Sequence, residues 1–118
     1  MDSIIATVGL KKIELALDKI IAFKAADKHI NVYYKNNGLY VIDGTIKNLS
    51  EKLGGSFVHI ERGTLINKSH VKGIVHKGTV LLVATSWKEF TISRRNRAKV
   101  KEIFGNKKRY SANAFKWI

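Results

Sequence analysis

The sequence predicts a mainly β protein of short strands with one or two small helices. Hydrophobic residues recur mostly at every second position, which is the period of a strand with one buried face. Glycine-containing turn sequences separate these runs, and only two segments carry the spacing of an amphipathic helix. A chain of 118 residues fits one domain and is long enough to bury a hydrophobic core.

Three strands are predicted in the first half of the chain. In KKIELAL (11–17), Ile13, Leu15 and Leu17 alternate with polar or small residues. The same alternation continues through KHINVYYK (28–35) and GLYVID (38–43). The sequence Lys-Asn-Asn-Gly between the last two runs is typical of a hairpin turn, so these two strands are expected to pair.

A short helix is predicted over residues 45–53. Ile46, Leu49 and Leu53 have the i, i+3, i+7 spacing that places them on one helical face. Thr45 is suited to the N-cap position, and two glycines after Leu53 end the helix.

The second half of the chain predicts four more strands and a second helix. The strands are FVHIE (57–61), TLIN (64–67), TVLLVA (79–84) and EFTI (89–92), with a turn at His76-Lys77-Gly78. Ser93 is a candidate cap for a helix whose apolar residues are Val100, Ile103 and Phe104, and Gly105 ends it. No adjacent pair of helices is predicted, which argues against a helix-turn-helix protein.

Charge points to a polyanionic partner. The chain has 22 Lys and Arg residues against nine Asp and Glu, for a formal net charge of +13 and a pI near 10.1. Residues 88–118 alone hold ten bases and two acids, a net charge of +8. Charge concentrated in this way favours a docking surface for DNA, RNA or an anionic membrane over simple solubility.

Several other classes of protein are not supported by the composition. No cysteine is present, and the spacing of His59, His70 and His76 matches no common metal site. The nine acidic residues are scattered singly, so we expect no enzyme, no metal, no cofactor and no small-molecule substrate. No apolar run approaches the ~20 residues that span a bilayer, and the first residues lack the basic start of a signal peptide. We therefore expect a cytoplasmic protein with no membrane partner.

The densest cationic cluster lies in FTISRRNRAKV (90–100), where Arg94, Arg95, Arg97 and Lys99 fall within six residues. Such a run is often the solvated side of a surface helix. However, cations at a helix N-terminus oppose the macrodipole, at a cost of about a few tenths of a kcal/mol each. A bound phosphate would reverse that penalty, because it would meet both the guanidinium groups and the free backbone N–H groups.

Four stretches in this order resemble the LytTR DNA-binding domain of bacterial response regulators and related transcription factors. They are IIAFKAADKHINVYY (20–34), GLYVIDGTIKNLSEKL (38–53), FVHIERGTLINKSHVKGI (57–74) and FTISRRNRAKVKEIF (90–104). The resemblance implies short, mostly antiparallel sheets in an elongated β sandwich with one or two small helices. It also implies loop side chains that enter successive major grooves of DNA.

The resemblance assigns residue roles by position. Family contact positions fall on His29, on Arg62, and on Arg95 with Asn96, which are expected to reach base edges. Phosphate contacts are expected from the neighbouring cations Lys28, Lys68, Arg94, Arg97 and Lys99. Departures occur in the middle loop: the family favours His-Arg-Ser where this chain has Glu61-Arg62-Gly63, and Arg is common where it has His59.

The expected function is sequence-specific binding of double-stranded DNA for transcription regulation in bacteria. Paired direct repeats and a dimer on DNA are family-level expectations. Two alternatives stay open at this point: a basic RNA-binding domain, for example ribosome-associated, and a module that docks an acidic protein. The expected organisation is a LytTR-like domain over residues 1–104, followed by a basic and aromatic C-terminal extension over 105–118.

Overall fold

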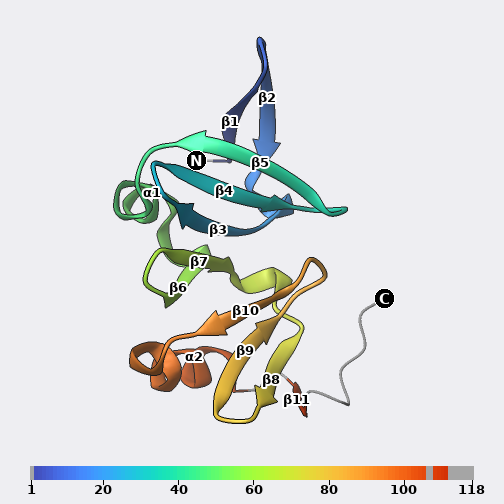
Figure 1. Ribbon diagram of the computed structural model, residues 1–118, viewed down its shortest axis with the longest axis vertical. Helices are drawn as coiled ribbons and strands as arrows, with labels where there is room; N and C mark the ends of the chain where they lie inside the picture. Colours follow the sequence, from blue (N-terminus) through green and yellow to red (C-terminus); the bar gives the residue numbers. More distant parts are fainter. Residues whose placement is uncertain (1, 106–107, 112–118) are drawn as a thin grey trace.

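The computed structural model describes residues 2–105 and 108–111 and is mainly β, as predicted. Its principal extents of 43 × 29 × 25 Å give the elongated shape seen in Figure 1. Eleven strands are described: β1 (Ser3–Val8), β2 (Lys11–Ala16), β3 (Ile20–Ala26), β4 (His29–Tyr34), β5 (Gly38–Asp43), β6 (Phe57–Glu61), β7 (Thr64–Asn67), β8 (Gly73–Lys77), β9 (Val80–Ala84), β10 (Glu89–Ile92) and β11 (Lys108–Ser111).

A five-stranded antiparallel sheet with the order β5-β4-β3-β7-β6 forms the centre of the molecule. One face buries Phe23, Ile30 and Val32 against the β1–β2 hairpin and against helix α1 (Ile46–Leu53). Helix α1 begins where the sequence predicts, since the Thr45 hydroxyl accepts a hydrogen bond from the Asn48 backbone N–H. Gly54 follows the helix with a φ of +69°, a value that suits glycine.

The opposite face of the central sheet packs against a second sheet with the order β10-β9-β8-β11. Ile66 and Ile60 from the first sheet meet Val83 and Phe90 from the second, and all four side chains are buried. Helix α2 (Arg97–Phe104) closes this core with Val100 and Phe104, as its spacing predicts. Ile103 is at the edge of that stripe and stays 36% exposed.

Four strands were not predicted from the pattern of residues, the first of which is β3, an apolar run in the middle of the central sheet. Strand β8 lies between Val71 and the predicted turn at Gly78, and it pairs with β9 as a hairpin. Strand β1 pairs with β2 in a hairpin that projects along the long axis (Figure 1). Strand β11 pairs with β8 in parallel, so the expected extension over 105–118 contributes a strand to the second sheet. Residues 106–107 and 112–118 of that extension lie outside the described residues.

Candidate nucleic-acid interface

Three connections lie along one side of the molecule, the left edge in Figure 1. They are the β3–β4 turn, the β6–β7 turn, and the segment that joins β10 to α2. The backbone N–H of Ala25 donates to the carbonyl of Gly63 at 2.7 Å, and that of Ser93 donates to the carbonyl of Ile60 at 2.9 Å. These two bonds tie each connection to the next, so the side chains that they carry are held in a row.

A hollow of about 740 Å³ lies between the second and third connections. It is lined by His59, Glu61, Arg62, Ser93, Arg95, Asn96 and Lys99. Three of the four residues expected to reach base edges (Arg62, Arg95 and Asn96) therefore meet in one place, although more than thirty residues separate the first from the others. The arginines are exposed, with their guanidinium groups available to an incoming ligand.

The β6–β7 turn has a local reason for presenting Arg62 outward. Only Arg62 and Gly63 connect the two strands, and Gly63 has a φ of +80°, which a residue with a side chain rarely adopts. A Cβ at Gly63 would also lie 3.3 Å from the Cβ of Ala25. The glycine thus allows both the tight turn and its close approach to β3.

The approach to α2 differs in detail from the prediction. Arg94, Arg95 and Asn96 form a short 3₁₀ turn, and the α-helix begins at Arg97. Ser93 makes no capping hydrogen bond with its side chain; its hydroxyl instead accepts a bond from the Asn96 side-chain amide at 2.8 Å. This bond fixes the Asn96 amide at the rim of the hollow and leaves its second N–H free to donate.

His59 and Glu61 also line this hollow, and sequence reasoning did not assign either residue to the contact surface. Burial, together with the positive charge of Lys99, lowers the pKa of His59 below its ordinary value of 6.5. The available signal was the period of two along β6, which places His59 and Glu61 on the same, partly exposed face of the strand that leads into Arg62.

His29 lies at the start of β4, outside the hollow. Its Nδ1 atom is 3.3 Å from the Oδ1 atom of Asp43, and the two residues are paired in the register of β4 and β5. The His29 side chain is still 56% exposed, and Lys28 beside it is exposed in the β3–β4 turn. The bond between Ala25 and Gly63 ties the end of β3 to the β6–β7 turn, so Lys28 and His29 lie in the same row as the residues of the other two connections.

The other cations lie in three different places. Arg94 and Lys99 are exposed beside the hollow. Arg97 instead turns to the β8–β9 hairpin, where its Nη2 atom donates to the carbonyl of Thr79 at 2.7 Å. Lys68 directly follows β7, beside the start of β6, where it and Lys99 line a smaller hollow of about 350 Å³.

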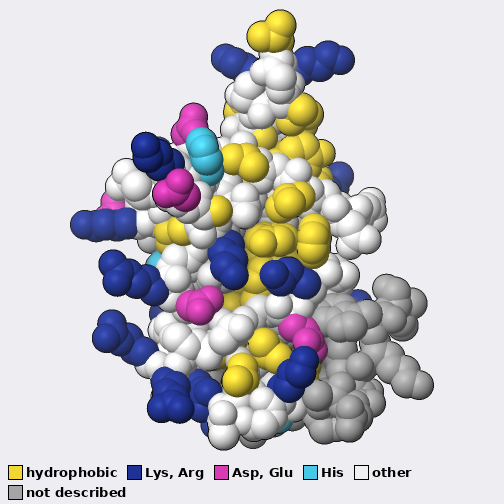
Figure 2. All heavy atoms as spheres, in the orientation of Figure 1, with side chains coloured by type: hydrophobic (Ala, Val, Ile, Leu, Met, Phe, Trp, Pro, Cys, Tyr) yellow, Lys and Arg dark blue, Asp and Glu magenta, His cyan; other side chains and the backbone are white. Residues whose placement is uncertain are grey.

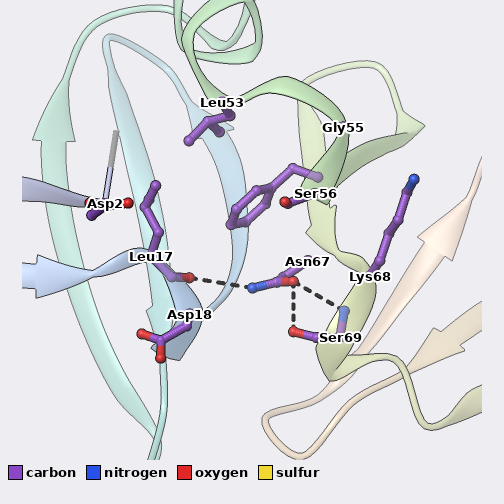
Figure 3. Close-up of a pocket in the computed structure, with 10 residues that line it drawn as sticks. Asp2, Leu17, Asp18, Leu53, Gly55, Ser56, Asn67, Lys68 and Ser69 are labelled. Carbon is purple, nitrogen blue, oxygen red and sulfur yellow. Dashed lines mark hydrogen bonds between the residues drawn. The ribbon is translucent and has the colours of Figure 1, made fainter.

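A second large hollow, of about 880 Å³, has a different character (Figure 3). Asp2 and Asp18 contribute carboxylates to it, and Leu53 and Phe57 contribute apolar wall. Asn67 on its floor is 4% exposed and donates to the carbonyls of Leu17 and Ile20. Its side-chain oxygen accepts two bonds from Ser69. Lys68 is the one cation among the residues that line this hollow, against two carboxylates, so the hollow is less suited to phosphate than the hollow that holds Arg62 and Arg95.

Basic side chains follow the edge of the molecule that carries the three connections, as the dark blue spheres on the left of Figure 2 show. Within the described part of the chain, no group of three or more His, Cys, Asp or Glu side chains could hold a metal ion. None of the described helices is long and apolar enough to cross a membrane.

A mainly β domain with a row of cationic turns along one edge has the features of a nucleic-acid-binding module. The chain matches the LytTr DNA-binding domain over residues 11–105, and it belongs to that family. Among solved structures it is similar to a LytTr DNA-binding domain from Bacillus cereus, described as part of a methyl-accepting/DNA response regulator. The TM-score is 0.78 at 16% sequence identity, with 89% of this chain and 98% of that chain covered. Comparison with curated protein sequences finds no match.

Membership of the family establishes the coarse function. The protein is a DNA-binding domain, of the kind through which response regulators act on transcription, and the family is not a catalytic one. The fold predicted from the resemblance is confirmed by the likeness to the Bacillus cereus domain. Strand β1 and the tip of its hairpin precede the matched residues.

Proposed function

We propose that this domain binds double-stranded DNA sequence-specifically to regulate transcription in bacteria, with its three connected turns entering successive major grooves. The observation that carries the proposal is the hollow in which Arg62, Arg95 and Asn96 meet. Arginine can bind the O6 and N7 atoms of guanine with two hydrogen bonds, and asparagine can bind the N6 and N7 atoms of adenine in the same way. One hollow thus holds side chains suited to two different bases.

The remaining residues divide between base and phosphate contacts. His29 reaches base edges from the β3–β4 turn, and Lys28 beside it contacts a phosphate. Arg94 and Lys99 flank the hollow and contact phosphates, and Lys68, in the turn after β7, extends the cationic path through the smaller hollow that it shares with Lys99. Arg97 was also expected to contact phosphate. Its bond to the Thr79 carbonyl supports a different role, which is to anchor α2 to the β8–β9 hairpin.

Further parts of the proposal concern the protein in the cell. Two copies bind paired direct repeats, and each copy uses the same row of turns. The protein acts in the cytoplasm, needs no cofactor, and catalyses no reaction. The match to a DNA-binding family supports this part of the proposal.

The decisive experiment is a selection from random double-stranded DNA at fixed salt, followed by sequencing of the bound fraction. We expect an enriched motif that occurs twice in the same orientation at a constant spacing. A parallel competition should show that a structured RNA of equal length displaces the selected duplex poorly. Enrichment of no motif, or preferential binding of the RNA, would contradict the proposal.

A further inference from the structure

Glu61 is the one acidic residue in the hollow that otherwise holds two arginines, a lysine, a histidine, a serine and an asparagine. It is the last residue of β6 and is partly buried. Among the residues that the structure describes, the only ion pair within 4 Å joins His29 and Asp43. The Glu61 carboxylate therefore faces a cationic hollow without being neutralised by Arg62, Arg95 or Lys99.

The carboxylate is held in place by the hairpin. Its Oε2 atom accepts a hydrogen bond from the Oγ1 atom of Thr64 at 3.5 Å, and Thr64 is 1% exposed. Glu61 and Thr64 are also paired across the β6–β7 turn, which has only two residues. The long contact to Thr64 uses one acceptor position, and the other carboxylate oxygen accepts no hydrogen bond from the residues that the structure describes.

A carboxylate in this place is poorly suited to the sugar-phosphate backbone, because phosphate and carboxylate repel each other. It is suited to a base that offers a hydrogen-bond donor. In the major groove only two bases do so, cytosine through its N4 amino group and adenine through its N6 amino group. The adenine amino group lies beside the N7 acceptor, which repels a carboxylate, whereas cytosine presents the amino group without a neighbouring acceptor.

We propose that Glu61 is a specificity-determining residue that accepts a hydrogen bond from the N4 amino group of a cytosine. The inference rests on the proposed function, because it requires the hollow to face the major groove. Arg95 or Arg62 in the same hollow reads guanine, so the two side-chain types together favour a site rich in C·G pairs. Thymine and guanine, which present acceptors at this edge, are rejected by the carboxylate.

The test compares four variants (Glu61→Ala, Glu61→Gln, Glu102→Gln and Arg95→Ala) with the natural chain in a selection from random duplex DNA, followed by titrations of the selected sequence. The natural chain is expected to select cytosine at one position of each half-site. Glu61→Ala should lose that preference by about tenfold or more in relative affinity, the scale of a base-edge contact. Glu61→Gln should switch the preference toward adenine, because glutamine binds the N6 and N7 atoms of adenine together.

Glu102→Gln is the matched control, since Glu102 is exposed on α2 and its loss changes the net charge by the same amount. This variant should select the same motif as the natural chain. A different outcome would overturn the inference: if Glu61→Gln and Glu102→Gln both raise the affinity for every duplex alike, Glu61 only tunes charge. Should the natural chain enrich no motif at all, the proposed function fails together with the inference. If Glu61→Gln selects the same motif as the natural chain while Arg95→Ala selects an altered one, the inference about Glu61 is wrong but the proposed function stands.

Discussion

The two large hollows of this protein have similar volumes but a different balance of charge. The hollow at Asn67 is about 880 Å³ and includes two carboxylates and one lysine, whereas the hollow at Arg95 is about 740 Å³ and includes two guanidinium groups, one lysine and one carboxylate. In the first, the central polar side chain bonds to backbone and side-chain groups of the protein itself. In the second, the arginines are exposed and point their donors at solvent. The volume of a hollow alone does not identify a binding surface. Hydrogen-bond donors that are exposed to solvent, together with the sign of the local charge, do identify it.

Replacement of Asn67 by alanine is expected to have the largest effect on the free energy of unfolding. The change removes bonds to the carbonyls of Leu17 and Ile20 and to Ser69, and it leaves buried polar groups without a partner. We expect a loss of about 2–4 kcal/mol, measured by urea unfolding. Asn48→Ala is the control, because Asn48 is exposed on α1. A loss as small as that of the control would mean that the first hollow is not held together by Asn67.

Arg95→Ala and Arg62→Ala should give the opposite result, with unchanged stability and lost specific binding. Each replacement removes a side chain that makes no hydrogen bond or ion pair with the other described residues and is free to bind a base. A base-edge contact contributes about 1–3 kcal/mol of discrimination, so the ratio of specific to random affinity should fall about ten- to a hundredfold in fluorescence anisotropy titrations. Lys101→Ala removes a charge of the same sign from an exposed position on α2 and should preserve that ratio.

The contrast between the hollows also explains what the sequence could and could not predict. Alternation along β4, β6 and β10 predicts the sheets, and the resemblance places Arg62 and Arg95 at contact positions. That these residues share a hollow depends on the bond between Ser93 and Ile60, a contact between two sheets that no local pattern encodes. The bond between Arg97 and Thr79, which joins α2 to the β8–β9 turn, is likewise a contact that no local pattern encodes. Strand β8 was missed because Ile74 and Val75, both buried, form a short apolar run without alternation.

The dependence of DNA affinity on salt concentration compares the two hollows one charged residue at a time. If Lys99 and Lys68 neutralise phosphates, each alanine replacement should reduce the slope of log affinity against log salt concentration by about one. Asp18→Asn, in the first hollow, should leave the slope unchanged, because its carboxylate is not expected to meet DNA. The slopes are obtained from titrations at several salt concentrations with a random duplex. If Lys68→Ala has the same slope as the natural chain, Lys68 does not contact a phosphate, and the phosphate contacts are confined to the neighbourhood of Lys99.

The smallest expected effect is the dependence on pH that comes from His59. Burial and Lys99 lower its pKa below 6.5, so between the two values the unfolded chain binds more protons than the folded one. The stability that this group contributes is therefore lost as the pH falls through that window. A phosphate near the hollow would favour the protonated ring and raise the pKa again, so DNA binding should take up a proton.

Affinity for DNA should consequently rise modestly as the pH falls from about 7.5 to about 5.5, and His59→Gln should remove part of that rise. His29→Gln is needed beside it, because His29 is a second histidine in the same row of turns, with its Nδ1 atom 3.3 Å from the Oδ1 atom of Asp43. The other charged residues that line the hollow with His59 are Arg62, Arg95, Lys99 and Glu61, so the Glu61→Gln variant tests whether the carboxylate contributes. Equal pH profiles for the natural chain and His59→Gln would place the bound phosphate beyond the reach of this ring, nearer to the exposed arginines at the rim.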